Sequence, residues 1–293
     1  MYYYVYLFRG CKLWESHPFT LKSWDDILSD DGLKQRRELS FIFRPQSGFT
    51  ARFRDYLQQT IEQGSPRSEL SVRMAVEGPY GTPYDVSRCS SILFIIGGSG
   101  ITVALSHLQF LSEAFRQAKK THNPTTPHSI RLVWSVRSRA LFEDVYQRDL
   151  SKSFSTSSYG TECQLRIDVH ITGESTTPAQ RQVSSDFKEV SLEDLSPCDD
   201  KDIELQASDT TGLGKSAAVP RIVAAGDFHM HDHRPAIRDL IFECAEEWQA
   251  TRAKMALVCC GPGAMIDDAR ATIASAVGRG YDEIEFHPEM FNW

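Results

Sequence analysis

The chain has 293 residues, with 32 lysines and arginines against 39 aspartates and glutamates, for a formal net charge of −7. This length suggests two domains with an ample core, and the 41% share of hydrophobic residues is typical of a soluble globular protein. The acidic balance argues against nucleic acid or an anionic membrane as the main partner. Seven scattered cysteines without a C-x-x-C pair indicate neither a disulfide framework nor a zinc site, so a reducing compartment fits best.

The N-terminal part of the chain reads as β-structure. Residues 2–8 and 39–45 are rich in aromatic and β-branched residues, so both predict strands. Pro18 biases the residue before it toward an extended conformation, which predicts a strand edge over residues 13–24. A further strand over residues 70–81 ends in a Gly-Pro-Tyr-Gly turn. We therefore expect a short β-region, with one helix in it, before the α/β part of the chain.

The helix of this region begins after residue 48. Phe53, Leu57 and Ile61 recur at helical spacing and mark its buried face, and Thr50 is a natural N-cap. Gly48 stands just before the helix start, where unpaired backbone N–H groups attract anions. The segment is therefore a candidate anion site.

The strongest local signal lies at residues 91–102, where an unbroken apolar run ends in a glycine cluster and a helical pattern follows. The run has no polar alternation, as expected for a parallel strand covered on both faces. Gly97, Gly98 and Gly100 permit a tight turn and the close approach of a ligand. The helix N-terminus makes an anion the expected occupant, although an ordinary glycine-rich turn is the alternative. Val103 stands where the G-x-G-x-x-G motif needs its third glycine, and no Walker loop is present.

Strands and helices alternate from residue 90 onward, which is the pattern of a parallel α/β sheet. A polar stretch at about residues 174–219, rich in Ser, Thr and Asp, breaks the alternation and reads as an inserted, disordered loop. The expected domains are residues 1–88 and residues 89–293, with the insert inside the second.

The end of the second parallel strand bears on which nucleotide would bind. In NAD-selective sites an acidic side chain near this point holds the ribose hydroxyls and would repel a 2′-phosphate. Here the strand runs into Ser135 and Arg137, with no carboxylate before Glu143. Arginine presents a planar fork of donors suited to phosphate oxygens. The pattern predicts NADPH as the cofactor, although a solvated basic loop would have the same sequence character.

Four stretches, taken in order, resemble one family: HPFT at 17–20, EGPYG at 77–81 with GGSGIT at 97–102, CGPG at 260–263, and the aromatic C-terminal tail. They resemble the flavin- and nicotinamide-binding half of ferric-chelate reductases and NADPH oxidases, and fungal ferric reductases most closely. The resemblance covers the whole chain apart from the insert, and the joint order is far more specific than any single motif.

The resemblance implies a ferredoxin-reductase-like fold, in which an antiparallel β-barrel, here partial, holds FAD and a parallel α/β sheet holds NADPH. It also implies an NADPH-dependent flavin oxidoreductase that passes electrons through FAD to a ferric chelate or another one-electron acceptor. Because NADPH gives two electrons and ferric iron takes one, FAD is needed as the converter.

The same resemblance assigns site residues. Those expected beside the isoalloxazine and ribityl chain of FAD are His17, Pro18, Phe19 and Thr20, with Gly48 to Thr50 at the flavin pyrophosphate. Those expected at the nicotinamide dinucleotide phosphates are Gly97, Gly98, Ser99, Gly100, Ile101 and Thr102. The turn of Gly78, Pro79, Tyr80 and Gly81 joins the cofactor-binding set, and Gly261 and Pro262 lie by the nicotinamide. The expected catalytic set is Cys260, in a positioning role, with the terminal aromatics Phe291 and Trp293, which cover the flavin until nicotinamide displaces them.

The chain departs from the family in two respects. It has no segment matching the family's haem-ligating membrane domain, so the chain as it stands is expected in the cytoplasm, whereas family members are membrane proteins with this half on the cytosolic side. The first strands of the barrel also have no match, so we expect weaker FAD binding. The alternative function is a truncated, catalytically impaired nucleotide-binding module with a regulatory or binding role.

Three alternating histidines, His229, His231 and His233, could place their imidazoles on one side of an extended segment and bind a metal. No acidic or cysteine partner has metal-site spacing, so we expect no metal here. The segment HRPAI better matches the family's Gly-Arg-Pro turn, with His233 in place of glycine. Cys259 and Trp134 are expected in the core.

Overall fold

The chain divides into two compact units, which are described separately. A computed structural model describes residues 1–7, 16–28, 35–45, 47–62, 72, 74–81, 84–121, 127–151, 163–173, 188–193, 205–208, 227–250 and 254–290. Unit 1 comprises Met1–Pro83 and Ala179–Lys215, and unit 2 comprises Tyr84–Pro178 and Ser216–Trp293.

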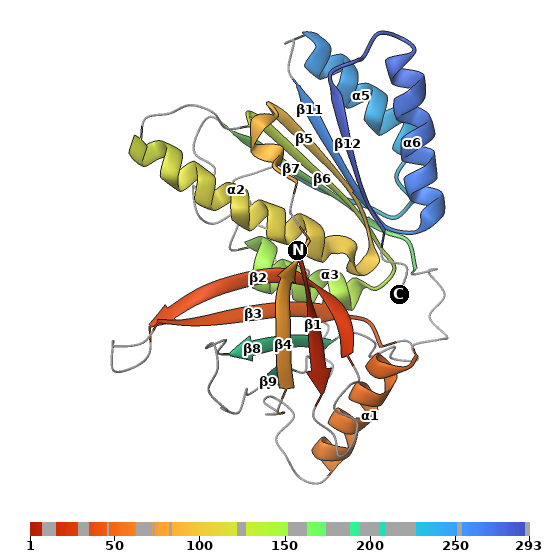
Figure 1. Cartoon of the computed structure of the whole chain (residues 1–293). Coiled ribbons are helices and arrows are strands. Elements are labelled where there is room, and N and C mark those ends of the chain that lie inside the picture. Colours follow the sequence, from red (N-terminus) through yellow and green to blue (C-terminus); the bar gives the residue numbers. More distant parts are fainter. Residues whose placement is uncertain are drawn as a thin grey trace. The chain divides into compact units, whose positions relative to one another are not determined.

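Unit 1 is built on one antiparallel sheet (Figure 1). Its strands are β1 (Tyr2–Leu7), β2 (Ser16–Leu28), β3 (Gln35–Phe43), β4 (Met74–Tyr80), β8 (Lys188–Glu193) and β9 (Leu205–Ser208). They lie in the order β4-β1-β2-β3-β8-β9, and every adjacent pair is antiparallel. The expected β-region is confirmed.

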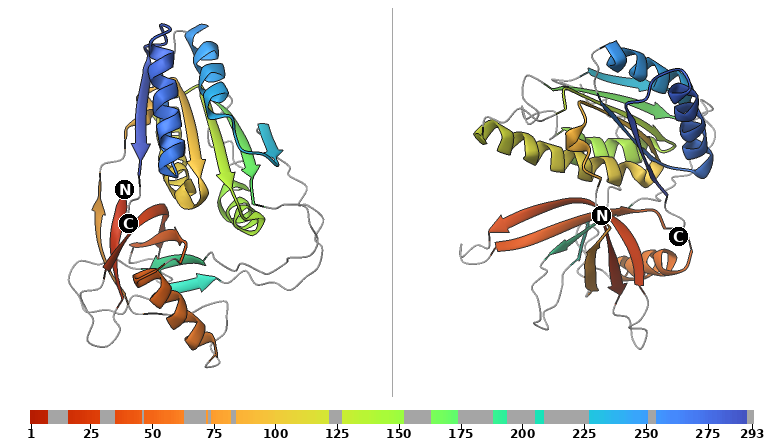
Figure 2. Two further views of the ribbon diagram at one scale, coloured as in Figure 1. Left: turned by 90° about the vertical axis from the view of Figure 1, so that its right-hand side faces the viewer. Right: turned by 45° about the horizontal axis from the view of Figure 1, so that its top comes forward.

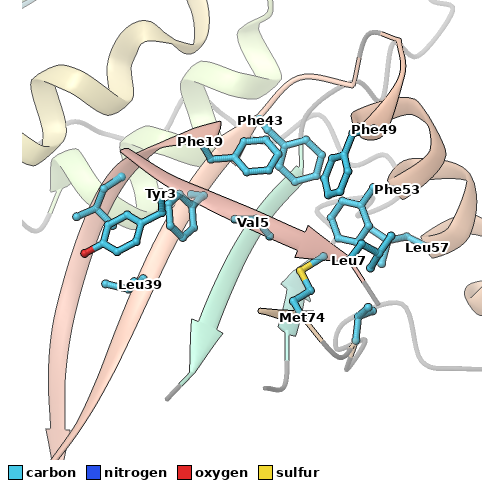
Figure 3. Close-up of a cluster of buried hydrophobic side chains, with 13 residues drawn as sticks. Tyr3, Val5, Leu7, Phe19, Leu39, Phe43, Phe49, Phe53, Leu57 and Met74 are labelled. Atoms are coloured by element: carbon cyan, nitrogen blue, oxygen red, sulfur yellow. The ribbon is translucent and has the colours of Figure 1, made fainter. Parts of the chain in front are cut away.

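The core of unit 1 lies between this sheet and helix α1 (Phe49–Glu62). In β1 buried and less buried residues alternate, as a strand with one face on a core requires. Phe19 and Phe43 from the sheet meet Phe49, Phe53 and other residues of α1 in a row of rings (Figure 3). Fully burying a ring of this size stabilises a fold by about 1.5–3 kcal/mol, so the row anchors the first turn of α1 to the strands.

Two expectations for unit 1 need correction. Helix α1 begins at Phe49, so Thr50 lies in its first turn and is not the N-cap; its hydroxyl donates to the carbonyl of Ser47 at 3.2 Å.

The polar stretch at 174–219 is not without structure, since it contributes β8 and β9, and β8 pairs with β3. In β8, Val190 and Leu192 alternate with polar residues, a short period-two pattern that the polar composition around it obscured.

Unit 2 is built on one parallel sheet. Its strands are β5 (Ser91–Gly97), β6 (Ser129–Val136), β7 (Gln164–Ile171), β10 (Asp227–His231), β11 (Met255–Cys260) and β12 (Ile284–Glu289). They lie in the order β10-β7-β6-β5-β11-β12, with β10 and β12 at the two ends (Figure 2). All pairs are parallel.

Helices cover both faces of the parallel sheet. They are α2 (Ile101–Thr121), α3 (Arg139–Val145) with the π-helical turn η3 (Tyr146–Leu150), α5 (Ile237–Ala250) and α6 (Gly263–Val277). Figure 1 shows α2 and α3 on one face and α5 and α6 on the other. The five central positions of β5 are 0–1% exposed, which explains why that strand is apolar at every position.

The strand order creates a switch point between β5 and β11. From β5 the chain proceeds to β6, β7 and β10 on one side, and then returns to β11 and β12 on the other. In open α/β sheets, ligands bind beyond the carboxyl ends of strands at such a point. The expected fold class, an antiparallel β-unit and a parallel α/β unit, is confirmed. Among the described helices, none has the length and apolar character needed to cross a bilayer.

A buried ion pair connects the strands of unit 2. The Arg131 guanidinium of β6 donates to Asp168 of β7 at 2.8 Å and to Glu243 of α5 at 3.0 Å. The side chains of Arg131 and Asp168 are only 9% and 2% exposed. Burial raises the pKa of Asp168, but hydrogen bonds from Arg131 and Arg166 outweigh it and hold the pKa below the ordinary 3.8.

We expect Asp168→Ala to destabilise unit 2 by about 3 kcal/mol, because it leaves the Arg131 charge buried with one partner fewer. Because the folded pKa of Asp168 is depressed, its contribution is present above the unfolded pKa and is lost as pH falls through the folded value. The difference in unfolding free energy between wild type and variant, measured by urea titration, should therefore shrink in acid. Arg270→Ala is the control, since its pair with Asp267 is exposed and should contribute less than about 1 kcal/mol. Equal losses for the two variants would contradict the assignment.

Candidate functional site

The glycine loop after β5 is held by hydrogen bonds from its neighbours. A 3-10 turn (Gly98–Gly100) connects β5 to α2, and Gly98 has a φ of +56° with open space around it. The indole of Trp134, at the end of β6, donates to the Gly98 carbonyl at 3.0 Å. The buried Thr102 hydroxyl donates to the Ser99 carbonyl at 3.2 Å. The loop is thus fixed by its own turn and by the adjacent strand.

The loop after β11 packs directly against the glycine loop. A Cβ placed on Gly100 would lie 2.7 Å from the Sγ of Cys260 and 3.1 Å from its carbonyl oxygen. A Cβ on Gly97 would lie 3.0 Å from Cδ of Pro262 and 3.3 Å from Cα of Gly261. The two loops at the switch point can approach this closely only because these positions are glycine.

Cys260 is a buried thiol rather than a reactive one. It is 1% exposed, and burial raises its pKa far above the ordinary range, so the sulfur stays protonated. This chemistry suits a positioning role and not a nucleophilic one. Its neighbour Cys259 is fully buried in the core beneath α5 and α6, as expected.

The end of β6 lies beside the glycine loop, because Ser135 pairs in register with Gly97. Two residues further on, Arg137 is exposed. The Ser138 hydroxyl accepts from Leu141 N–H and so caps α3, which commits it to the helix. Ser135 is half-buried and Arg137 is exposed at this carboxyl edge of the sheet.

The four residues at 17–20 do not present their side chains to one side of β2. Successive side chains of a strand point to opposite faces. Phe19 is buried in the core, and the His17 ring stacks on Phe49 with centroids 5.9 Å apart. Pro18 and Thr20 lie on the other face. The side chains of Phe19 and of Thr20 thus cannot flank the same ligand, and the core side chain of Phe19 serves the fold.

An aromatic group lies beside Pro18 and Thr20 on β1 and β4. Tyr4 pairs with Pro18 and Tyr2 pairs with Thr20 in register. The Tyr2 and Tyr80 rings are stacked with centroids 5.8 Å apart, and Tyr4 meets Tyr80 edge-on at 5.6 Å. Tyr2 and Tyr80 thus lie roughly parallel with Tyr4 edge-on to both, which makes an aromatic cluster of the kind that a planar cofactor ring can contact.

Glu77 stabilises this aromatic group from its edge. The Tyr6 hydroxyl donates to the Glu77 carboxylate at 2.5 Å, and the Tyr80 hydroxyl donates to the same carboxylate. The bond to Glu77 raises the pKa of Tyr80 to about 12, so its ring stays neutral at physiological pH. The hydrogen bond to Glu77 holds the Tyr80 ring in place, and a ring held in place is better suited to stacking than a mobile one.

The turn after β4 and the start of α1 complete the predicted residues of unit 1. A Cβ on Gly78 would lie 2.7 Å from the Tyr3 ring, so the packing against β1 requires glycine there. Gly78 and Pro79 are joined by a cis peptide, and Gly81 has a φ of +73° next to the Tyr2 ring. Gly48 has a φ of +64° with nothing within 4 Å. Phe291 and Trp293 lie outside the described residues.

Four contributing residues were missed by sequence reasoning. Trp134 was expected only in the core, yet its indole also fixes the glycine loop. Tyr2 and Tyr4 were read as strand residues, although tyrosines that alternate along one strand were a usable signal for an aromatic surface. Met265 of α6 covers Gly261, and no sequence signal indicates that contact.

Two protein-family models match this chain, one in each half of the sequence. Residues 1–84 match the family model described as "FAD-binding domain". Residues 89–274 match that described as "Ferric reductase NAD binding domain". The chain therefore belongs to the ferric reductase family, and the expected cofactor classes, FAD and a nicotinamide dinucleotide, are confirmed.

The chain is also similar to curated relatives and, more distantly, to a solved structure. Ferric reductase transmembrane component 5 of Saccharomyces cerevisiae is 27% identical over the whole chain, which spans 34% of that relative. Probable cell surface ferric reductase kap2 of Aspergillus oryzae is 37% identical over 46% of the chain and 17% of that protein. The chain thus spans about a third of the length of its yeast relatives. A ferredoxin-NADP+ reductase from Plasmodium falciparum is similar at 12% identity and a TM-score of 0.43, covering 99% of this chain and 82% of that one.

Gly98→Ala and Gly100→Ala should separate two roles in the glycine loop. In Gly100→Ala the new methyl meets Cys260, so we expect a stability loss of about 1–3 kcal/mol together with weaker nucleotide binding. In Gly98→Ala the methyl enters open space, and the positive φ costs about 1–2 kcal/mol at most, while the space offered to a phosphate is narrowed. Urea unfolding and calorimetric titration with NADP+ measure both quantities.

The control for these variants is Gly278→Ala at the end of α6. Gly278 has an ordinary helical φ of −62°, and an added Cβ would meet only ordinary contacts at 3.5 Å. It should leave stability and nucleotide affinity nearly unchanged. Normal NADP+ affinity in both loop variants would mean that the glycine cluster is merely a turn.

Proposed function

We propose that the chain transfers electrons from NADPH through FAD to a ferric chelate or another one-electron acceptor. The observation that carries this proposal is the pairing, in one chain, of a match to an FAD-binding domain with a match to a ferric reductase NAD-binding domain. The stoichiometry requires two ferric ions for each NADPH, giving NADP+, two ferrous ions and one proton. When bound, FAD supplies the conversion between hydride transfer and single-electron transfer.

The glycine loop is proposed to receive the dinucleotide pyrophosphate. Gly98 leaves room for the backbone to approach a phosphate, and α2 behind it has no acidic residue in its first turn. The positive end of a helix dipole stabilises an anion by about 0.3–1 kcal/mol, and partly buried sites gain more. The residues assigned to this role are Gly97, Gly98, Ser99, Gly100, Ile101 and Thr102. Ser99 and Thr102 act in part through their mutual hydrogen bond, which holds the turn.

The 2′-phosphate that distinguishes NADPH from NADH is proposed to lie at Ser135 and Arg137. Ser135 is in register with Gly97, so a dinucleotide on the glycine loop would extend along this edge. Arg137 is exposed there, and its guanidinium can take two phosphate oxygens at once. Cys260, Gly261 and Pro262 would limit how deeply the nicotinamide ring enters, because their loop is packed against the glycine loop.

FAD is proposed to lie along the tyrosine surface of unit 1. Pro18, Thr20 and Tyr80 share that surface with Tyr2 and Tyr4, which suits the isoalloxazine. Burial lowers the pKa of His17, so the imidazole beside Phe49 is neutral at pH 7 and adds no charge near a flavin. Gly48 and the N-terminus of α1, which has no acidic residue in its first turn, would hold the flavin pyrophosphate. The turn from Gly78 to Gly81 shapes the edge of this surface, and Phe291 and Trp293 are proposed to cover the flavin.

The names of the relatives support a proposal for the electron acceptor. Their printed names describe ferric reductase transmembrane components. On that ground we propose that ferric iron is the terminal acceptor. The resemblance to ferric-chelate reductases adds the proposal that the chain serves a cytosolic face and that electrons reach a haem-containing membrane part in the complete system.

The visible spectrum of the purified chain tests this function directly. With added FAD we expect a bound-flavin band that bleaches anaerobically on addition of NADPH, followed by recovery of the band when ferric citrate is added. A band that dithionite bleaches and NADPH does not would exclude hydride transfer. Failure to retain FAD at saturating concentration would favour the alternative role as a regulatory nucleotide-binding module.

Arg137→Ala should raise the Michaelis constant for NADPH by roughly tenfold to a hundredfold, because a hydrogen bond to a charged group contributes about 1.5–3 kcal/mol. The Michaelis constant for NADH should change little, since NADH lacks the phosphate. Arg270→Ala, an exposed arginine on α6, is the matched control and should affect neither cofactor. Equal losses with both cofactors would give Arg137 a structural role, and a wild-type preference for NADH would overturn the assignment.

A further inference from the structure

Three histidines from separate segments meet in unit 2. His170 lies near the end of β7, His231 ends β10, and His233 follows two residues later. One ring nitrogen from each lies within 4.8 Å of the other two. The rings are nearly parallel, with centroids 4.4 Å apart for His170 and His231 and 5.4 Å apart for His231 and His233. The cluster lies at the same carboxyl edge of the sheet as the glycine loop, because His170 pairs in register with Ser135 and Ser135 with Gly97.

Strand register produces the cluster. His231 pairs with His170 in the parallel ladder between β10 and β7, so both side chains leave the sheet on the same face. His229 lies on that face as well but one step back, with its ring centroid 6.5 Å from that of His231. It pairs in register with Asp168 and stands outside the group of three.

Two of the three imidazoles have a second ring nitrogen held by an oxygen. His170 Nδ1 is 2.8 Å from the carbonyl oxygen of His233, so the neutral ring donates its Nδ1–H there and keeps a lone pair on Nε2. His231 Nε2 lies 3.5 Å from Oδ1 of Asp168, a carboxylate fixed by Arg131 and Arg166. Metal-binding histidines typically have such an oxygen behind the ring, because it sets the tautomer and the ring orientation.

We propose that His170, His231 and His233 bind one divalent transition-metal ion of the class that prefers imidazole, such as Zn²⁺ or Cu²⁺. Tetrahedral coordination at metal–nitrogen distances of about 2.0–2.1 Å requires nitrogens about 3.3 Å apart. The nitrogens must therefore close by roughly 1.5 Å at most from their 4.8 Å limit. Because the rings are nearly parallel, they must also tilt so that their in-plane lone pairs converge on one ion. The exposed His233 can rotate its side chain, and small rotations of His170 and His231 complete the site.

The ion would tie the segment after β10 to the neighbouring strand. β10 lies at one end of the described sheet and has only β7 as its partner. His233 lies beyond the last paired residue of β10, so a bond from its ring to a metal held by His170 would fix the turn that leads to α5. Binding to the folded state alone raises stability by RT ln(1 + [L]/Kd), so the ion should raise the melting temperature.

Calorimetric titration of the metal-free full chain with Zn²⁺ tests the proposal, and Cu²⁺ electron paramagnetic resonance reports the nitrogen ligands. We expect one tight equivalent of Zn²⁺, a Cu²⁺ spectrum with at least two coordinated nitrogens, and a higher melting temperature with Zn²⁺. His233→Ala and His170→Gln should each weaken Zn²⁺ binding by at least about 100-fold, because even outer partners of a metal site contribute 10–100-fold.

His229→Ala is the matched control, since it removes an imidazole from the same strand and the same face outside the cluster. It should leave Zn²⁺ affinity and the Cu²⁺ spectrum unchanged. Tight Zn²⁺ binding that survives in His233→Ala would place the ion elsewhere and overturn the proposal. Absence of tight binding by the wild-type chain would do the same and leave the histidines as a stack of packed rings. If His170→Gln fails to fold, the exposed His233 variant and the wild-type Cu²⁺ spectrum still decide.

Discussion

The contact between the loop after β5 and the loop after β11 is the constraint on which unit 2 depends. Both loops begin at the switch point of the sheet, where Cys260 pairs with Ile96 in register. The closest approach is at Gly100, where even a methyl group would overlap the Cys260 sulfur. Because backbones this close leave no room for adjustment, the position of the α2 N-terminus is set by β11 as much as by β5. The Trp134 indole then fixes the turn from the third strand, so three adjacent strands together determine where the loop N–H groups point.

Glycine is required for different physical reasons along the chain. At Gly100 and Gly78 the reason is a neighbour: Cys260 in one case and the Tyr3 ring in the other. At Gly98 and Gly48 the reason is the backbone, since each has a positive φ and faces open space. Open space beside a helix start is what a ligand needs, whereas a filled space is what packing needs. This contrast separates the glycines suited to binding from those that hold the fold. The sequence alone does not show to which group a glycine belongs.

The fold was predictable from sequence to the extent that each strand carries its own pattern. The all-apolar run of β5 indicates burial on both faces, and the aromatic strand β1 indicates a sheet with one buried face. Prediction failed where the outcome depends on a distant partner. β8 is short and polar, and it is a strand because β3 offers it an edge. Thr50 has the right chemistry for an N-cap, but the helix begins at Phe49, after the turn at Gly48, and so two residues earlier than an N-cap at Thr50 would place it.

For the candidate sites, too, local patterns could be predicted from sequence and contacts with distant partners could not. The glycine loop and Arg137 could be located because a strand-turn-helix pattern is local. The split of residues 17–20 between two faces follows from strand alternation, but which face carries the tyrosines follows from register with β1, which composition does not reveal. The spacing of His229, His231 and His233 raised the possibility of a metal site, but no partner residue was evident nearby in the sequence. His170, which joins His231 and His233 in the structure, lies 63 residues before His233.

Register is also what keeps the histidine cluster on one face of the sheet. Phe228 precedes His229 on β10 and points to the opposite face, where it contacts Phe142 of α3 and Tyr146 of η3. A slip of one residue would exchange the faces, placing an imidazole among aromatic rings and a phenyl ring against the Asp168 carboxylate. Both exchanges are unfavourable. The imidazole would be buried without a hydrogen-bond partner, and the Asp168 carboxylate would lose a polar neighbour. The aromatic contact on one face of β10 therefore specifies which side chains gather on the other.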